Sequence, residues 1–272
     1  KYIMGDQGTY FSKSLKYYSN SLSNFRRNQV RVRPTGNDSA NSGQTTRIDV
    51  PANSIINMAS FAIHLNAALQ SGGTGANIVS PPSSWGLIQR FNILINGISI
   101  SNINNYGQLY QTLLNLTCGE DKLKTILPTH NPVAHRGNTR NVTNSASVAY
   151  VIDSHLGLCQ CEPQYLDTSL LGDLSLEITW ANDQGMQVVR NADDDASVAL
   201  SGNVYSDIVA VFDIISFEDQ IYRSLISAKL AQGSIQVPFS NWYVYQGSKS
   251  TGGTFRTTCS SRSIDRVLLT CR

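Results

Sequence analysis

The clearest hydrophobic pattern in the chain is an alternation over residues 91–102, FNILINGISISN. Two apolar runs flank Asn96 and Gly97, which both tolerate the positive φ angles of a two-residue type I′ turn. Closing a hairpin there places residue 95 opposite 98 and residue 93 opposite 100, and residues opposite each other share a face of a sheet. This register predicts an apolar face made by Phe91, Ile93, Ile95, Ile98 and Ile100, and a polar face made by Asn92, Ser99 and Ser101. One dry face and one polar face are typical of an antiparallel sheet packed on a core.

Similar strand-like runs occur on both sides of the hairpin, separated by stretches rich in Gly, Ser, Asn and Pro. They predict strands over residues 45–51, 56–65, 88–95, 98–103, 146–153, 164–170, 173–181 and 204–217. The alternation in 173–181 points its apolar row, including Trp180, toward a core. About eight antiparallel strands in two sheets make a jelly roll, whereas an immunoglobulin-like sandwich has about seven strands in about 100 residues. We therefore predict an all-β fold, a jelly-roll sandwich.

Two segments have the periodicity of amphipathic helices. The first comes directly after the hairpin, and Gly119 is its expected end; its stripe comprises Tyr106, Leu109, Tyr110, Leu113 and Leu114. The second segment, SFEDQIYRSLISAKLAQG, begins with Ser216 and Asp219 at the spacing of a capping box and ends at Gly233. We expect the first helix to be inserted in the roll and the second to link the roll to another domain.

A short repeat predicts the nature of the segment after the linker helix. Residues 48–51 and 235–238 both read I-x-V-P, at an offset of 187 residues, and proline suits a strand end because it cannot donate to a ladder. The offset equals one sandwich plus the helix, so the second copy predicts the start of a second jelly roll. A complete second roll would run far beyond residue 272. We therefore expect a truncated chain, or partner strands from another polypeptide.

The predicted organisation has four parts: an N-terminal arm and loop over 1–44, a first jelly roll over 45–216, a linker helix over 217–232 and the beginning of a second roll over 233–272.

The N-terminal arm carries the main charge feature of the chain. A short amphipathic helix is expected first, with an apolar face made by Tyr10, Phe11, Leu15, Tyr18 and Leu22. The stretch FRRNQVRVRP then places four arginines within eight residues: Arg26, Arg27, Arg31 and Arg33. Such a cluster can contact the phosphates of nucleic acid. Because no aromatic residue interleaves with the arginines, a solvated terminus or one docked on a neighbour is the competing interpretation.

Composition narrows the function classes further. Charged residues make up 15% of the chain, against about 25% in typical globular proteins, and the net charge is +2. Neutral polar surfaces of this kind are common in sandwiches and in proteins that bury much surface in assemblies. No apolar run reaches the roughly 18 residues of a membrane span. The start, KYIMGDQGTYFSKS, lacks an initiating Met and the apolar core of a signal peptide, so we expect a processed or incomplete chain.

The sequence contains no recognisable constellation for catalysis or metal binding. Its five cysteines, at positions 118, 159, 161, 259 and 271, lack the paired spacing of a zinc site, so we expect reduced thiols in an intracellular compartment. The four histidines are scattered, the run Asp193–Asp195 lacks the spacing of a calcium loop, and no nucleophile-elbow or phosphate-loop motif occurs. We predict a protein that is not an enzyme and needs no metal or cofactor. The sequons at Asn37, Asn115 and Asn141 leave glycosylation open.

Four segments together resemble the double jelly-roll major capsid proteins of polinton-like viruses and virophages, in the lineage that includes adenovirus hexon. They are TTRIDVPANSIINM at the first predicted strand, LIQRFNILINGISISNINNYGQLYQTL at the hairpin and helix, YLDTSLLGDLSLEITW near the end of the first roll, and GSIQVPFSNWYVYQG opening the second. Their order and spacing carry the resemblance over most of residues 45–245, since no single motif is diagnostic.

The resemblance implies a structural major capsid protein of an icosahedral double-stranded DNA virus, assembled inside the host cell and located in the virion. Family members form homotrimers, and two rolls per chain make each trimer a pseudo-hexameric capsomer. The implied partners are copies of the chain, neighbouring capsomers and minor capsid or penton proteins, with no membrane span. Arg26, Arg27, Arg31 and Arg33 would face the viral interior, with weak genome contact, or a cementing protein.

Two other functions stay open at this point. A single jelly roll would suit a minor capsid or penton protein, although the I-x-V-P pair argues for two rolls. A lectin-like, carbohydrate-binding jelly roll would stack sugars on exposed aromatic rings, for which Trp85, Trp180 and Trp242 are the candidates. The strand patterns favour core positions for Trp180 and Trp242, which weighs against sugar binding.

Overall fold

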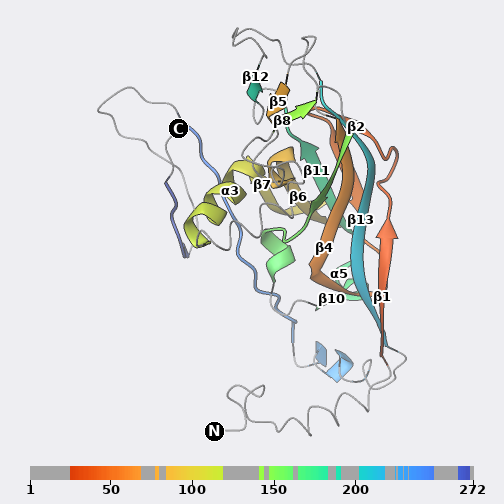
Figure 1. Ribbon diagram of the computed structural model, residues 1–272. Helices are drawn as coiled ribbons and strands as arrows, with labels where there is room; N and C mark the ends of the chain where they lie inside the picture. The colour runs from red at the N-terminus through yellow and green to blue at the C-terminus, as the bar shows by residue number, and fades with distance from the viewer. Residues whose placement is uncertain are drawn as a thin grey trace, which may run out of the picture.

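The structure is a computed structural model that describes residues 25–68, 77–79, 84–118, 141–143, 147–161, 165–182, 188–190, 202–217, 224, 226–228, 230–231, 233–247 and 263–269. Strands dominate these residues and form two main antiparallel sheets, with a small third sheet at one end (Figure 1). Among the described helices, none has the length and apolar character needed to cross a bilayer.

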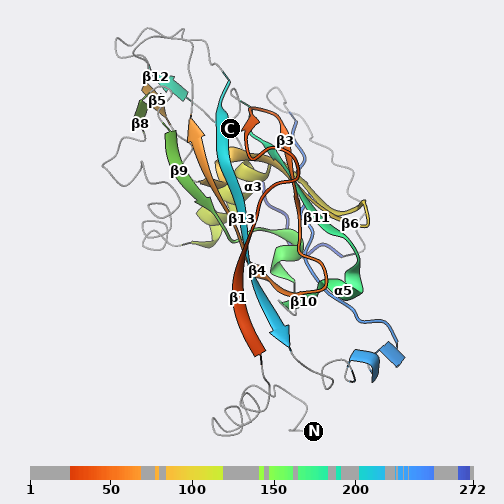
Figure 2. The ribbon, with the colours of Figure 1, turned by 90° about the vertical axis from the view of Figure 1, so that its right-hand side faces the viewer.

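The larger sheet is built around two long strands that lie side by side. Its members are β1 (Phe25–Val32), β2 (Ala40–Asn41), β4 (Ile55–Ala68), β9 (Ser147–Ile152), β10 (Tyr165–Asp167) and β13 (Val204–Phe217). β4 pairs with β13, and β1 extends the sheet on the far side of β13. β9 and β10 both pair with β4, along different parts of it. They therefore act as two halves of one interrupted strand (Figure 2).

The second sheet has four strands in the order β3 (Thr45–Asp49), β11 (Leu174–Trp180), β6 (Ile88–Ile95) and β7 (Ile98–Asn104). With β9 and β10 counted as one strand and the short β2 left aside, the two sheets share eight strands. One sheet holds the first, eighth, third and sixth of these in spatial order, and the other holds the second, seventh, fourth and fifth. This order is that of a jelly roll, so the predicted fold class is confirmed.

The two ends of the roll are built differently. At one end, three short strands from the loops between the main strands form a small sheet. Their order is β12 (Val188–Arg190), β5 (Asn77–Val79) and β8 (Asn141–Thr143). At the opposite end the chain enters the roll at the start of β1 and leaves it at the end of β13, where Phe25 pairs with Phe217 (Figure 1).

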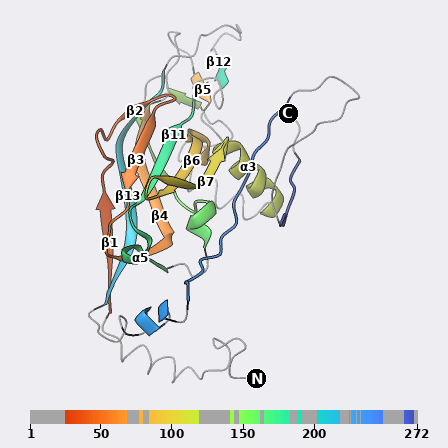
Figure 3. The ribbon, with the colours of Figure 1, turned by 180° about the vertical axis from the view of Figure 1, so that it is seen from behind.

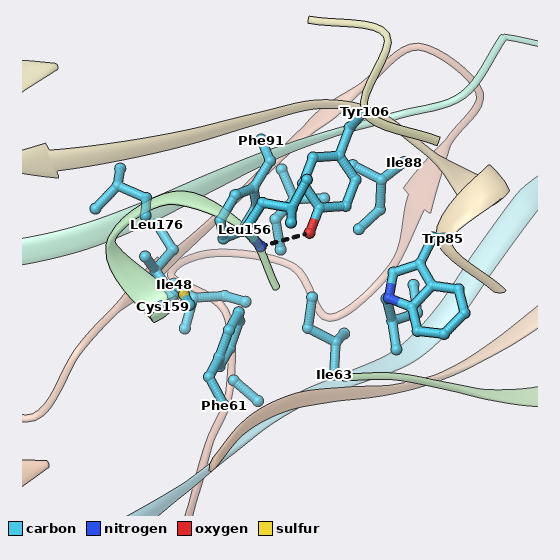
Figure 4. Packing of buried hydrophobic residues seen from close by; sticks show 14 of the residues in the cluster. Ile48, Phe61, Ile63, Trp85, Ile88, Phe91, Tyr106, Leu156, Cys159 and Leu176 are labelled. Atoms are coloured by element: carbon cyan, nitrogen blue, oxygen red, sulfur yellow. Dashed lines mark hydrogen bonds between the residues drawn. The ribbon is translucent and has the colours of Figure 1, made fainter. Parts of the chain in front are cut away.

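The two main sheets enclose a continuous apolar core, part of which is shown in Figure 4. Phe61 of β4 stacks on Phe212 of β13 with ring centroids 4.9 Å apart. Trp180 of β11 points inward as its alternation predicts, and its indole N–H donates to Thr46 Oγ1 at 2.8 Å. The buried indole therefore keeps a hydrogen-bond partner, as buried polar groups require.

The predicted turn between β6 and β7 forms, with Asn96 at φ 50° and Gly97 at φ 77°. Asn96 also fastens the turn to the start of β11. Its backbone N–H donates to the Asp173 carbonyl at 2.8 Å, and its side-chain oxygen accepts from the Asp173 N–H at 2.9 Å. Gly172, at φ 79°, lies so close to the Asn96 side chain that a Cβ there would clash with it.

The hairpin register departs from the prediction a few residues from the turn. A β-bulge falls where Ile100 has no partner, so Ile93 pairs with Ser101 instead. The predicted faces are therefore wrong in β7: Ser101 and Ile103 are buried, whereas Ile98 beside the turn is 70% exposed. One extra residue exchanges the two faces of a strand, because side chains alternate with a period of two.

The first roll begins earlier than residue 45. Residues 25–32 form β1 and residues 40–41 form β2, both paired with β13. Val30 and Val32 pack against the core from β1, so this segment belongs to the sandwich. The predicted boundary between arm and roll is therefore wrong for these strands. The amphipathic helix expected over residues 10–22 lies outside the described residues.

The helix predicted after the hairpin is confirmed as α3 (Tyr106–Thr117), which buries Tyr106, Tyr110 and Leu114. Tyr110 stacks on Trp85 of the 3₁₀ helix η1 (Ser84–Leu87) with ring centroids 4.2 Å apart. Helical residues also occur at 224, 226–228 and 230–231, inside the predicted linker. Ser216 is no helix cap, however, because it is still part of β13 and pairs with Arg26.

The first copy of the I-x-V-P repeat lies in the second strand of the roll, not at its start. Ile48 lies in β3, the second strand of the roll, 23 residues after the first residue of β1. A second roll in the same register would need its first strand to start at residue 212, inside β13. The start of a second roll therefore needs support other than this repeat.

Candidate assembly surfaces

The four arginines singled out in the sequence lie on or just after β1, and we call them the arginine row (Arg26, Arg27, Arg31 and Arg33). β1 is the edge strand of the larger sheet, and all four side chains are exposed. Because Val30 and Val32 face the core, alternation places Arg27, Arg31 and Arg33 together on the outward side.

One member of the arginine row is neutralised within the chain. The Arg27 guanidinium forms an ion pair with Asp213 of the neighbouring strand β13, and its Nε donates to Asp213 Oδ2 at 3.1 Å. The hydrogen bond and the charge of Asp213 raise the pKa of Arg27. Arg26, Arg31 and Arg33 form no ion pair with any described residue. Three positive charges are therefore left available to a partner.

Residues 233–247, which we call the C-terminal strap, run in an extended conformation past α3 (Figures 1 and 3). The strap packs against the core through side chains that are partly buried: Val237, Phe239, Trp242 and Val244. Ser101 Oγ donates to Asn241 Oδ1 at 3.1 Å, and Gln246 Nε2 donates to Gln108 Oε1 of α3 at 2.8 Å. Within the described residues, no backbone hydrogen bond joins the strap to the roll.

The C-terminal strap and the segment 263–269 also expose several large apolar side chains. Ile235, Tyr243 and Tyr245 are 41%, 59% and 44% exposed, and in the segment 263–269 Leu269 reaches 87%. Exposed apolar side chains gathered in this way are typical of surfaces that take part in interactions.

The core also contains a polar centre that the sequence does not reveal. His155 is buried between Phe61 and Phe91, with ring centroids at 4.5 and 5.0 Å. Its Nε2 faces the Ile152 carbonyl at 3.2 Å and its Nδ1 faces the Tyr106 hydroxyl at 3.3 Å. A carbonyl can only accept, so Nε2 carries the proton and Nδ1 accepts from Tyr106.

A third hydrogen bond satisfies the Tyr106 hydroxyl as an acceptor. The Tyr106 oxygen accepts the Leu156 N–H at 3.1 Å (Figure 4). Burial lowers the pKa of His155 from 6.5 to about 3 and raises the pKa of Tyr106. Both side chains are therefore neutral structural groups, and their arrangement offers no nucleophile or accessible base for catalysis.

The other residues considered from the sequence are not brought together. Cys159 and Cys161 are buried, and burial raises the pKa of both thiols. Among the described residues, no group of His, Cys, Asp or Glu could hold a metal ion. His130, His135 and Asp193–Asp195 lie outside the described residues. Trp85 and Trp180 are buried and Trp242 is partly buried, so none of the three tryptophans offers an open ring to a sugar.

Taken together, the strand order and the enclosed core define a jelly roll. No family model matches the sequence, and no curated protein matches it. Among solved structures, the Faustovirus major capsid protein is similar over 75% of this chain and 56% of its own chain, with a TM-score of 0.51 and 9% identity.

Two further capsid structures match less closely. The capsid of PBCV-1 is similar over 75% of this chain and 45% of its own chain, at a TM-score of 0.49 and 16% identity. For the mavirus major capsid protein the shares are 71% and 47%, at a TM-score of 0.37 and 11% identity. The chain thus spans about half the length of the capsid proteins it matches. The similarity to the Faustovirus protein confirms the predicted resemblance at the level of the fold.

Proposed function

We propose that this protein is a structural building block of a viral capsid, located in the virion. The observation that carries the proposal is the complete jelly-roll strand order, found in a chain whose fold is similar to that of the Faustovirus major capsid protein. The neutral, charge-poor composition and the exposed apolar strap support a protein that works by association. On this proposal the chain has no catalytic role.

We further propose that the capsid protein contains two jelly rolls, of which residues 25–217 form the first. The matched share of the Faustovirus chain, 56%, leaves room for a second roll in proteins of this fold. The exposed apolar residues of the strap and of 263–269 supply the surface that the second roll would cover. The helical residues between 224 and 231 occupy the place of the linker.

Two rolls per chain suit a trimer, because three such chains give six rolls around one axis. The proposed assembly is a homotrimer that acts as a pseudo-hexameric capsomer in an icosahedral shell, next to copies of itself and to minor capsid or penton proteins. Interfaces of obligate assemblies are large and apolar, so a stable trimer would require the second roll to be docked and folded.

The test is the mass of the full-length gene product in size-exclusion chromatography with light scattering. We expect a stable trimer, seen as a pseudo-hexagonal particle by negative-stain microscopy. Val267→Asp, at a residue that is 74% exposed, should lower the yield of trimer. Ile98→Asp is the matched control, since Ile98 is 70% exposed but lies on a turn of the roll. A well-behaved monomer, or equal losses in both variants, would contradict the proposed assembly.

A further inference from the structure

The arginine row combines a rigid backbone with unneutralised charge. β1 is held by eight residue pairs to β13, so its side chains project at fixed intervals. Two residues along a strand span about 6.7 Å, close to twice the roughly 3.4 Å axial spacing of phosphates on one strand of DNA. Arg31 and Arg33 are two residues apart, are exposed, and form no ion pair with any described residue.

Charge is also distributed unevenly along the chain. Residues 1–34 contain three lysines, four arginines and one aspartate, a net charge of +6. The whole chain has a net charge of +2, so residues 35–272 together carry −4. A basic segment joined to a mildly acidic remainder is typical of proteins that contact a polyanion locally while the rest of their surface does not.

Arg31 lies beside Val211 of β13, and Arg33 follows it directly after the end of β1. We propose that Arg31 and Arg33 bind the phosphate backbone of nucleic acid, a contact that does not rest on the proposed capsid function. Arg27 shares their outward side but remains paired with Asp213. Arg26 lies on the opposite side of β1, with Val30 and Val32.

The choice of nucleic acid over an acidic protein rests on geometry. Arg31 and Arg33 lie two residues apart at the end of β1, a span of about 6.7 Å that matches two phosphate intervals along one strand of DNA. An acidic protein segment would need carboxylates at the same spacing as the arginines. The arginine–carboxylate pair that the structure does contain, Arg27 with Asp213, is formed within the chain and not with a partner. Contacts to phosphates are independent of base sequence and weaken steeply with salt.

The experiment measures binding of the full chain to a fluorescent 20-nucleotide DNA, single-stranded and as a duplex, between 50 and 300 mM salt. The Arg31→Gln/Arg33→Gln variant should bind several-fold more weakly, and the slope of log affinity against log salt should fall by about 1.5, since each phosphate contact contributes roughly 0.7–0.9. The matched control, Arg47→Gln/Arg266→Gln, removes the same charge from exposed arginines elsewhere and should keep the slope of the parent protein.

Three results would overturn the contact: no DNA binding by the parent protein, equal losses in both double variants, or binding only to vesicles of phosphatidylserine and phosphatidylcholine. Circular dichroism of each variant verifies that the roll is folded. The oligomeric state, measured on the same samples, separates the two proposals. A trimer without DNA binding refutes the phosphate contact alone, whereas a monomer that binds DNA through Arg31 and Arg33 refutes the proposed capsid role alone.

Discussion

The roll and the C-terminal strap are built from similar sequence patterns but are held in different ways. In the roll, strands such as β13 are hydrogen-bonded on both sides, to β1 and to β4. The strap over 233–247 has a comparable share of β-branched and aromatic residues, yet within the described residues it contacts the roll only through side chains. It also exposes apolar rings such as Tyr243.

The difference shows what an alternating pattern can and cannot specify. Alternation predicts that a segment is extended and has one apolar side. It does not say whether an adjacent strand will supply the ladder, because that depends on residues far away in the sequence. The roll contains all the strands that its pattern requires, whereas the strap leaves apolar side chains such as Ile235, Tyr243 and Tyr245 exposed.

The largest effect is expected when a phenylalanine is replaced by alanine, a substitution that can be made in both the roll and the strap. Phe61→Ala should lower the free energy of unfolding by about 3–5 kcal/mol, because it removes a fully buried ring and leaves a cavity beside Phe212 and His155. Phe239→Ala in the strap should cost less than about 2 kcal/mol, since that ring is only partly buried. Urea unfolding measures both, and equal losses would show that strap and roll form a single core.

The second test asks whether His155 causes the free energy of unfolding of the roll to fall at acidic pH. The unfolded chain protonates His155 near pH 6.5 and the folded chain only near pH 3, so the unfolded state binds more protons between these values. The contribution of neutral His155 is complete above pH 6.5 and is lost as the pH falls, by up to about 1.4 kcal/mol per pH unit.

The measurement compares urea unfolding of the parent protein and of His155→Phe between pH 7.5 and pH 4.5. Loss of the hydrogen bonds to Tyr106 and Ile152 lowers the absolute stability of the variant, so the slope against pH is the informative quantity. The variant should have the shallower slope. Identical slopes in the two proteins would mean that His155 is not the group that links acid to unfolding of the roll.

The third test concerns the turn that β11 holds in place, where the informative quantity is the difference between two glycine variants. Gly172→Ala and Gly97→Ala both force a side chain into a positive φ, 79° and 77°, at a cost of about 1–2 kcal/mol each. Only at Gly172 does the added Cβ also meet Asn96, which should add about 1–3 kcal/mol of overpacking. Thermal unfolding of the two variants gives the difference, and equal melting temperatures would show that the Asn96 contact does not fasten the roll.

Much of the fold could be predicted because it depends on local patterns. The turn at Asn96 and Gly97, the helix α3 and the inward row of β11 all follow from a few adjacent residues. The register of β7 could not, since the bulge at Ile100 is favoured by burial of Ile103 and not by any residue at the turn. The strand β1 was not predicted, because its arginines suggested a solvated arm. Its alternation of core-facing Val30 and Val32 with exposed residues is recognisable only once the partner strand is known.

The candidate surfaces were predictable to a smaller extent. The arginine row is visible in the sequence, but its position on a rigid edge strand, and the neutralisation of Arg27 by Asp213, depend on a partner 186 residues away. The polar centre at His155 has no sequence signal, because its partners come from β9 and α3 and its neighbouring rings from β4 and β6. The nearest usable hint is an isolated histidine inside an apolar stretch, which does not distinguish a core residue from a ligand.

Phe25 and Phe217 are paired across β1 and β13, so the ends of a 193-residue module meet at a single point. Such a module can be spliced into a longer polypeptide, or copied in tandem, without stretching any connection across its body. Gene duplication could therefore lengthen this protein by whole units while each unit keeps its own core intact. The relative tilt of successive units would then be set by the junction between them, a short stretch that evolution can alter without cost to folding.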